Sequence, residues 1–230
     1  MSTVAIYTAF RWARGWEHQL VSSVLGQICS DWRWYVSFEM NREPKDGNLV
    51  RKATADDERI IIREQDEPTD LIGLAKARAL ACVQDEKWAI HLDSDDWLEP
   101  ESVGEVMARE TTDAPMMVAW QLSHRYGRPP FLVEAQIPLT VENILAQPWM
   151  ADFWRAYNVH SVRAVGGYDR SLFVAEDWDL DCRLAQQWGP PLVIPYPLGH
   201  KTERGMDRDP ARQADCVARV MKKNELREYK

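Results

Sequence analysis

Residues 87–96 read KWAIHLDSDD, a short apolar run that ends in three aspartates within four positions. The run predicts a buried strand, because its apolar and aromatic residues suit a core position in a sheet. In open α/β sheets, ligands bind beyond the carboxyl ends of the strands, which is where Asp93, Asp95 and Asp96 fall. Carboxylates this close repel one another unless a cation neutralises them, and Mg²⁺ and Mn²⁺ prefer such oxygen ligands. We therefore interpret the cluster as a divalent-cation site; the alternative is that the aspartates only cap the following helix.

A second acidic motif lies in the other half of the chain, where residues 165–169 read VGGYD and residues 175–180 read AEDWDL. The paired glycines Gly166 and Gly167 allow a tight turn or a close backbone approach. Glu176 and Asp177 then stand at the start of a predicted helix. A carboxylate outside the metal cluster suits a general base that takes a proton from a reacting hydroxyl, and we assign Asp177 to this role. An acidic helix start that only complements the helix dipole is the alternative.

Strands and helices alternate on both sides of the KWAIHL run. The pattern predicts a mainly parallel sheet covered by helices, an α/β fold. Residues 41–57 are polar and predict a loop, and residues 123–140, with three prolines, predict a hairpin or a long loop. The predicted strands are residues 3–8, 34–38, 59–63, 87–92, 116–122 and 192–196, and the predicted helices are residues 16–28, 70–84, 175–188, one from Pro100 and one from Pro210.

The composition is that of a globular protein of 230 residues with a net charge of -8. This length fits one α/β domain, and the acidic balance excludes an overall basic field for nucleic acid or anionic lipid. The four cysteines form no CxxC pair, which argues against a zinc site and predicts reduced thiols. The sequence shows no signal peptide and no apolar run long enough to span a membrane. We expect a cytoplasmic protein, peripheral to a membrane if its acceptor is bound there.

Four segments, taken in order, resemble glycosyltransferase family 2, whose members have the GT-A fold. They are residues 23–27 (SVLGQ), 73–78 (GLAKAR), 92–96 (LDSDD) and 165–169 (VGGYD) followed by 176–184 (EDWDLDCRL). The resemblance implies a mixed, mainly parallel sheet with helices on both faces. It implies a single domain over residues 1–230, with a nucleotide-sugar-binding half at 1–122, an acceptor and catalytic half at 123–200 and a tail helix at 201–230.

The resemblance also implies metal-dependent, inverting transfer of a sugar from a nucleoside diphosphate sugar, by default a UDP-sugar, to an acceptor hydroxyl, with Mn²⁺ or Mg²⁺ as cofactor. Asp177 would be the base, Arg78 would lie near the diphosphate, and His200 would complete the metal site beside Asp95. The implied donor-binding residues are Thr8, Phe10, Glu39, Arg78, Asp93 and Ser94, and the acceptor-side residues are Asp96, Glu176 and Trp178.

Two segments depart from the family pattern. Residues 7–11 read YTAFR where the family has a PTYN-like sequence, and residues 38–41 read FEMN where it has DDGS. Glu39 still offers a carboxylate to a nucleotide base. Two other functions stay open: a glycoside hydrolase with paired carboxylates, which needs no divalent cation, and a non-catalytic module that binds a nucleotide sugar or a glycan. The acceptor is open among glycans, lipid carriers, proteins and modified nucleic acids, and so is the oligomeric state.

Overall fold

The computed structural model of the chain describes residues 3–10, 15–39, 48–125, 127–135, 139–146, 153–203 and 210–224. Several sequence predictions fall partly outside these ranges. They are the end of the YTAFR segment at Arg11, the end of the FEMN segment at residues 40–41, and parts of the predicted loop at 41–57, of the hairpin at 123–140 and of the tail at 201–230.

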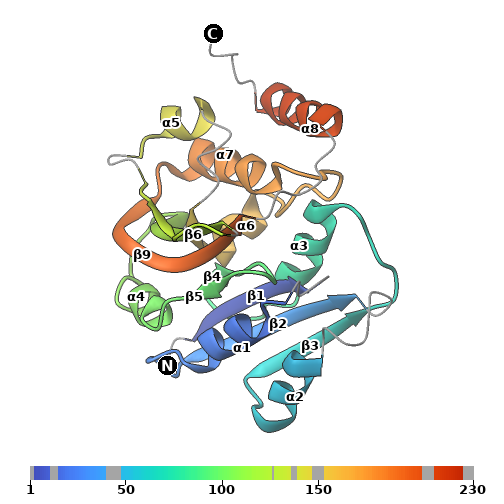
Figure 1. The fold of residues 1–230 in the computed structure, drawn as a ribbon. Helices are drawn as coiled ribbons and strands as arrows, with labels where there is room; N and C mark the ends of the chain where they lie inside the picture. The colour runs from blue at the N-terminus through green and yellow to red at the C-terminus, as the bar shows by residue number, and fades with distance from the viewer. Residues whose placement is uncertain are drawn as a thin grey trace.

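The described strands form one nine-stranded sheet in the order β3-β2-β1-β4-β8-β6-β9-β5, with β7 paired to β6 (Figure 1). The four strands at one side, β3, β2, β1 and β4, are parallel to one another. Beyond them, β8 lies antiparallel to both β4 and β6, while β6 and β9 are parallel. The strands are β1 (Val4–Phe10), β2 (Trp32–Glu39), β3 (Ile60–Gln65), β4 (Trp88–His91), β5 (Trp97–Leu98), β6 (Met116–Arg125), β7 (Phe131–Val133), β8 (Trp154–Asn158) and β9 (Leu192–Glu203).

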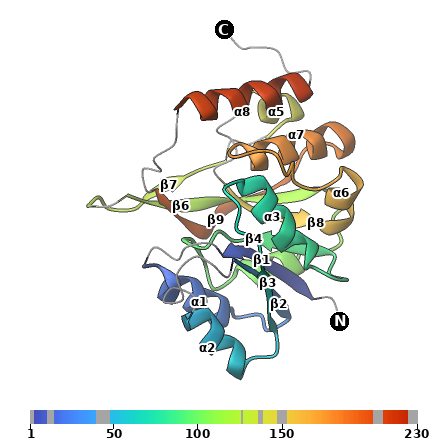
Figure 2. The same ribbon diagram turned by 90° about the vertical axis from the view of Figure 1, so that its right-hand side faces the viewer.

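Helices cover both faces of the sheet (Figure 2). Side chains of α1, α2 and α4 enter one apolar cluster with Ile6 and Trp34, and side chains of α3 and of α5 to α8 enter a second cluster with Ala5 and Tyr35. Neighbouring residues of one strand thus face opposite cores, as strand geometry requires. The helices are α1 (Glu17–Leu25), α2 (Asn48–Asp56), α3 (Ile72–Ala81), α4 (Ser102–Met107), α5 (Val141–Ala146), α6 (Val159–Ala164), α7 (Glu176–Trp188) and α8 (Pro210–Lys223).

The central strand shows why this sequence folds as a parallel sheet. β1 reads VAIYTAF, and all its residues except Ala9 are buried. A strand with a parallel neighbour on each side and helices on both faces has no solvated face, so a continuous apolar run suits it. The carboxyl ends of β1 and β4 meet at one edge of the sheet, because their registers pair Tyr7 with His91.

The structure corrects some of the predicted elements. The prediction of a loop over residues 41–57 is wrong for its second part, which forms α2. Among the side chains described, that helix buries only Val50, and its sequence is polar on average, which is why the segment was predicted to be a loop. The prediction missed β5, β8, α5 and α6, and β9 runs on past Pro195 and Pro197 to Glu203. The two prolines are accommodated where the pairing of β6 with β9 shifts register, at Ala119 to Gln121.

No helix in the described part of the chain is long and apolar enough to cross a membrane. The predicted tail helix is confirmed as α8, which lies over α7 and buries Cys216 and Val220 against it.

Candidate active site

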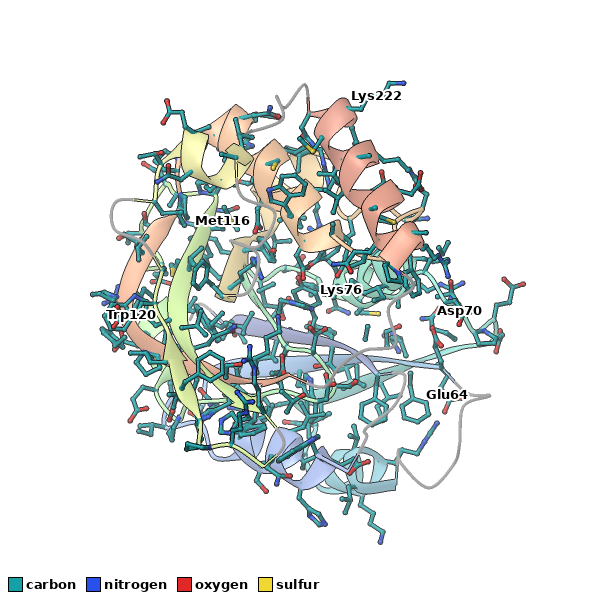
Figure 3. All side chains as sticks on the ribbon, turned by 45° about the horizontal axis from the view of Figure 1, so that its top comes forward. Glu64, Asp70, Lys76, Met116, Trp120 and Lys222 are labelled. Carbon is teal, nitrogen blue, oxygen red and sulfur yellow. The ribbon has the colours of Figure 1, made fainter. Side chains whose placement is uncertain are left out.

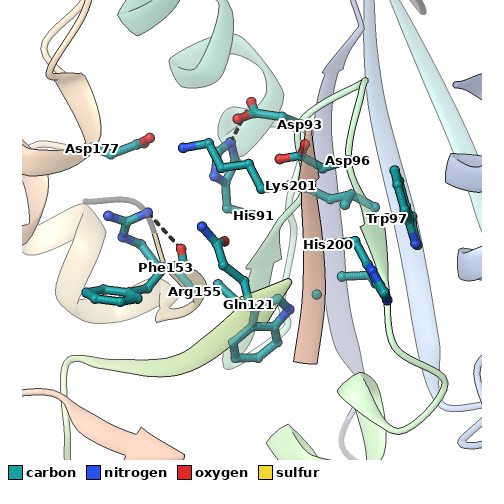
Figure 4. Close-up of a pocket in the computed structure, with 14 residues that line it drawn as sticks. His91, Asp93, Asp96, Trp97, Gln121, Phe153, Arg155, Asp177, His200 and Lys201 are labelled. Atoms are coloured by element: carbon teal, nitrogen blue, oxygen red, sulfur yellow. Dashed lines mark hydrogen bonds and ion pairs between the residues drawn. The ribbon is translucent and has the colours of Figure 1, made fainter. Parts of the chain in front are cut away.

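A pocket lies beyond the carboxyl end of β4, at the edge of the sheet where the sequence predicts a ligand site. Asp93 and Asp96 line it from the segment that follows β4. Arg155 of β8, Asp177 of α7 and His200 of β9 line it from elements that come much later in the chain (Figure 4). The two acidic motifs therefore meet at one cavity.

Lys76 of α3 joins the two motifs. Its ammonium nitrogen Nζ lies 2.7 Å from Asp177 Oδ2, 2.8 Å from Glu176 Oε1 and 3.7 Å from Asp93 Oδ1. The Lys76 side chain is only 4% exposed and its partners Glu176 and Asp177 are also largely shielded from water, whereas the Asp93 side chain is 40% exposed. Figure 3 shows Lys76 in the interior of the molecule, with Glu64 and Asp70 at its rim. A single buried cation thus holds three carboxylates close together.

The charges in this cluster shift the pKa values of its members. Burial acts to raise the pKa of Asp177, but the charges of Lys76 and His91 outweigh it and lower that pKa to about 2. Burial opposes the Lys76 ammonium, but Asp177 and Asp93 hold its pKa well above the ordinary value. For Glu176, burial dominates and raises the pKa. Asp177 is therefore ionised at neutral pH, as a proton acceptor must be.

The paired glycines place α7 and its carboxylates. Gly166 and Gly167 have φ values of 86° and 70°, so the turn uses the left-handed conformation that favours glycine. Arg183 of α7 donates to the carbonyl oxygens of Val165 at 2.6 Å and Gly167 at 2.7 Å, which ties the turn to the helix. The next residue, Tyr168, reaches β1, since its hydroxyl lies 2.7 Å from that of Tyr7. The motif is thus a structural support for the carboxylates that follow it.

α7 begins at a residue with an unusual backbone conformation. Ala175, at its N-cap, has φ 64° and is the one residue other than glycine with positive φ in the described ranges. This conformation is costly for a residue with a Cβ atom. It occurs directly before Glu176 and Asp177, where the chain turns to present both carboxylates to Lys76.

The aspartates after β4 form a turn closed by a hydrogen bond from the Asp96 backbone N–H to the Asp93 carbonyl at 3.2 Å. Asp96 Oδ1 accepts a hydrogen bond from the Thr202 backbone N–H at 2.8 Å. Burial, and then the charges of Asp95 and Asp93, raise the pKa of Asp96 well above its ordinary value. The charges of Asp95 and Asp93 thus oppose ionisation of Asp96. For Asp93, burial is outweighed by the charges of Lys76 and His91, which lower the pKa. The oxygen donors of this segment are of the kind that a hard divalent cation prefers.

The predicted histidine lies at this pocket, with both ring nitrogens engaged. His200 Nε2 lies 2.7 Å from Glu99 Oε1, and Nδ1 lies 2.8 Å from His124 Nε2. The His200 ring also stacks on Trp97 at a centroid distance of 4.9 Å. Within the ranges described, no three His, Cys, Asp or Glu side chains are grouped so that they alone could hold a metal ion. A cation held by one or two carboxylates together with substrate phosphates needs no such group.

The structure places several predicted donor-site residues away from the pocket. Thr8 is fully buried and its hydroxyl accepts a hydrogen bond from the Trp34 indole at 3.0 Å. Phe10 is buried against Phe38, with ring centroids 5.2 Å apart. Both side chains lie in the core because β1 has helices on both faces, so they do not offer a ligand surface.

The other predicted residues outside the pocket lining are Glu39, Arg78, Ser94, Asp95, Glu176 and Trp178. Arg78 donates to the Glu67 carbonyl at 2.7 Å, and the predicted acceptor-side Trp178 is 1% exposed and donates to the Ile144 carbonyl at 2.8 Å. Trp178 faces the core because it shares a face of α7 with the buried residues Cys182 and Ala185. Glu39, at the end of β2, is buried and accepts from the Thr69 backbone N–H at 3.3 Å. Ser94 lies in the turn between the aspartates, half-buried.

Two basic residues of the site, Lys76 and Arg155, were missed by the sequence predictions. A signal for Lys76 exists, because Gly73, Ala79 and Leu80 share its buried helix face at spacings of three and four. Arg78 lies two positions after Lys76 and is not on the buried face of the helix. Arg155 carries no such signal, since β8 itself was not predicted.

The sequence matches no protein-family model and no curated protein. Solved structures are similar, and the fold they define is the GT-A fold of glycosyltransferases, which confirms the prediction. At 12% to 13% identity the likeness is one of fold.

S. aureus TarS has a TM-score of 0.73 at 12% identity, over 97% of this chain and 39% of that chain. GalNAc-T7 with UDP, GalNAc and Mn²⁺ has a TM-score of 0.69 at 13% identity, over 99% of this chain and 55% of that chain. The mannosyltransferase PcManGT from Pyrobaculum calidifontis, in complex with GDP-Man and Mn²⁺, has a TM-score of 0.63 at 13% identity, over 96% of this chain and 63% of that chain. The chain thus spans about two fifths to two thirds of their lengths.

Proposed function

We propose that the chain is a metal-dependent, inverting glycosyltransferase that moves a sugar from a nucleoside diphosphate sugar to an acceptor hydroxyl. One observation carries the proposal: Asp93, from the motif after β4, and Asp177, from the motif at the start of α7, line one pocket and share Lys76. The GT-A fold supports it. Structures with this fold have UDP, UDP-GlcNAc or GDP-Man bound, and we propose a UDP-sugar as donor because UDP is the more frequent ligand.

Asp177 is the proposed base. Its Oδ2 is bound to Lys76, and its Oδ1 is buried without a hydrogen-bond partner among the residues described. Oδ1 is thus the oxygen open to an acceptor hydroxyl. A base that removes the hydroxyl proton during a single displacement, on the face opposite the departing diphosphate, produces inversion at the anomeric carbon. Glu176, the residue before Asp177, also binds Lys76 and so helps to hold the lysine beside Asp177.

Mn²⁺ or Mg²⁺ is the proposed cofactor, held by Asp95 together with the diphosphate of the donor. The repulsion of the Asp96 carboxylate by Asp95 and Asp93 supports this assignment. When bound, the ion offsets the negative charge that develops on the departing diphosphate. Asp93 is the proposed contact to the nucleotide sugar. His200 joins the ligand set only if it gives up His124 or Glu99, so we propose it as an auxiliary ligand.

A donor panel tests the proposal. Purified protein is incubated with Mn²⁺ and UDP- and GDP-sugars in turn, and release of nucleoside diphosphate is measured with water or an added glycan as acceptor. We expect release from at least one donor and its loss with EDTA. Glycan hydrolysis that persists in EDTA would instead indicate a glycoside hydrolase. Tight nucleotide binding without any release would indicate a binding module.

A further inference from the structure

Arg155 carries a buried donor that the protein itself does not use. Its side chain is 4% exposed. Nε donates to Asp181 Oδ2 at 2.9 Å and Nη1 donates to the Phe153 carbonyl at 3.0 Å. Nη2 is buried and has no hydrogen-bond partner in the described part of the chain. A buried polar group without a partner is costly, so an open donor on an otherwise fixed guanidinium indicates a ligand.

A matching open acceptor lies in the same pocket. Asp177 Oδ1 is buried and unpartnered within the described ranges, while Oδ2 is held by Lys76. Arg155 and Asp177 both line the pocket, and Figure 4 shows the two side chains on the same side of it. A hydroxyl group is the ligand that satisfies one donor and one acceptor at once, because its oxygen accepts while its hydrogen is donated.

The charges favour a neutral hydroxyl over an anionic group at Arg155. Asp181 accepts from Arg155 through Oδ2 and from the Tyr157 hydroxyl through Oδ1 at 3.0 Å, so the guanidinium already has a buried carboxylate as its partner. Asp177 adds a second negative charge beside the open donor. A carboxylate or phosphate at this point would meet Asp177 and be repelled.

We propose that Arg155 binds the acceptor hydroxyl together with Asp177, an inference that rests on the proposed function. Nη2 donates to the hydroxyl oxygen, and the hydroxyl hydrogen points to Asp177 Oδ1. In the transfer step the O–H bond breaks and its proton goes to Asp177 Oδ1. A lone pair of the oxygen forms the new bond to the anomeric carbon, and the bond from that carbon to the diphosphate breaks, leaving its electron pair on the diphosphate oxygen. Arg155 thereby aims the nucleophile.

The test compares R155K with Y157F, using the donor that the wild type cleaves fastest in the panel and water as the acceptor hydroxyl. R155K keeps a cation beside Asp181 but removes the guanidinium group, and with it Nη2. Y157F removes the hydrogen bond from the Tyr157 hydroxyl to Asp181 Oδ1, and it removes no hydrogen-bond donor from the pocket. We expect R155K to lower kcat for nucleoside diphosphate release roughly tenfold or more. We expect Y157F to stay close to the wild type, and the Kd for UDP with Mn²⁺ to change little in both variants.

Three outcomes would overturn the inference. They are wild-type turnover by R155K, equal losses in R155K and Y157F, and a loss of UDP affinity in R155K that matches its loss of rate. The last would place Arg155 on the donor diphosphate. The double variant R155Q/D181N removes the ion pair as a unit, so no unpaired charge is left buried; it should show the same loss of rate if R155K folds poorly. Absence of release from the wild type with every donor would overturn the proposed function, and this inference with it.

Discussion

Lys76 is the residue on which the geometry of the site depends. It is a buried ammonium within 3.7 Å of carboxylates from two motifs that are far apart in the sequence. Buried charges are tolerated only when they are paired, and breaking such a pair leaves the partner's charge uncompensated. Lys76 and Asp177 therefore stabilise each other in the folded state, and this pairing has a measurable pH dependence.

We expect D177N to lower the free energy of unfolding at neutral pH by about 2 kcal/mol. The folded-state pKa of Asp177 lies near 2, below its ordinary value of 3.8, so its contribution is complete above the ordinary value and is lost as the pH falls through 2. Urea unfolding of wild type and D177N should therefore differ most above about pH 4 and converge towards about pH 2. A difference that is unchanged across this range would show that Lys76 and Asp177 are not paired.

The individual residues differ in how far the sequence predicts them. Asp93 and Asp177 were predicted from acidic motifs at the ends of a strand and a turn, and both line the pocket. Thr8 and Phe10 were assigned from the resemblance to a glycosyltransferase family, but β1 extends through Phe10 and buries them. Lys76 was predictable from the helical spacing of its buried neighbours. Arg155 was not predictable, because its unpartnered Nη2 can be identified only once the positions of Asp181 and Phe153 are known.

At the scale of elements, a close contact between α3 and the loop before α7 sets the distance from Lys76 to the carboxylates. A Cβ atom added to Gly73 would lie 2.1 Å from the Asp169 carbonyl oxygen, and the Gly73 N–H donates to the Leu172 carbonyl at 3.0 Å. A glycine is therefore required here by the approach of two backbones. The GLAKAR and VGGYD segments, which the sequence presents as separate motifs, pack on each other.

We expect G73A to lower the free energy of unfolding by about 1–3 kcal/mol, because either α3 or the loop must shift to admit the methyl group. The matched control is G104A in α4, where an added Cβ would meet only Cys29 Cβ at 3.8 Å, an ordinary contact. This change should be neutral or stabilising by up to about 1 kcal/mol, since alanine is the better helix former. Chemical denaturation of both variants checks the pair. Equal effects would contradict the proposed close contact.

The elements themselves were predicted best where the apolar pattern is strong. The strands β1, β2, β3 and β4 and the helices α3 and α7 were predicted close to their observed positions, because buried parallel strands and amphipathic helices have clear periods. The second half of the sheet was predicted less well. β8 is short and antiparallel, β5 has two residues, and β9 passes two prolines, so their pairing depends on the rest of the sheet.

At the scale of the whole molecule, the order of strands brings the site together. The parallel half of the sheet ends at β4, and β8 then pairs with β4 in the opposite direction. This pairing carries Arg155 to the same pocket as Asp93, while α7 covers it from the face shared with α3. The pocket is therefore built from both halves of the chain, and ligand binding there is expected to stabilise the fold as a unit.

We expect UDP and Mn²⁺ together to raise the Tm more than the sum of their separate effects, because each is proposed to bind through the other. A ligand at 100 times its Kd adds about 2.7 kcal/mol of stability, which for a domain of this size is a shift of several degrees. Thermal denaturation with and without EDTA checks this. In D95A, the part of the increase in Tm that depends on Mn²⁺ should be lost. An unchanged shift in EDTA would contradict a metal held jointly by Asp95 and the diphosphate.

Turnover by D177N is the most direct test of the central claim, that Asp177 is the base of a sugar transfer at this pocket. The comparison variant is E176Q, which changes the neighbouring carboxylate on the same lysine and leaves Asp177 Oδ1 in place. With the best donor of the panel and Mn²⁺, D177N should lose roughly 100-fold or more in kcat while still binding UDP, and E176Q should lose less. Wild-type turnover by a folded, UDP-binding D177N would contradict the account.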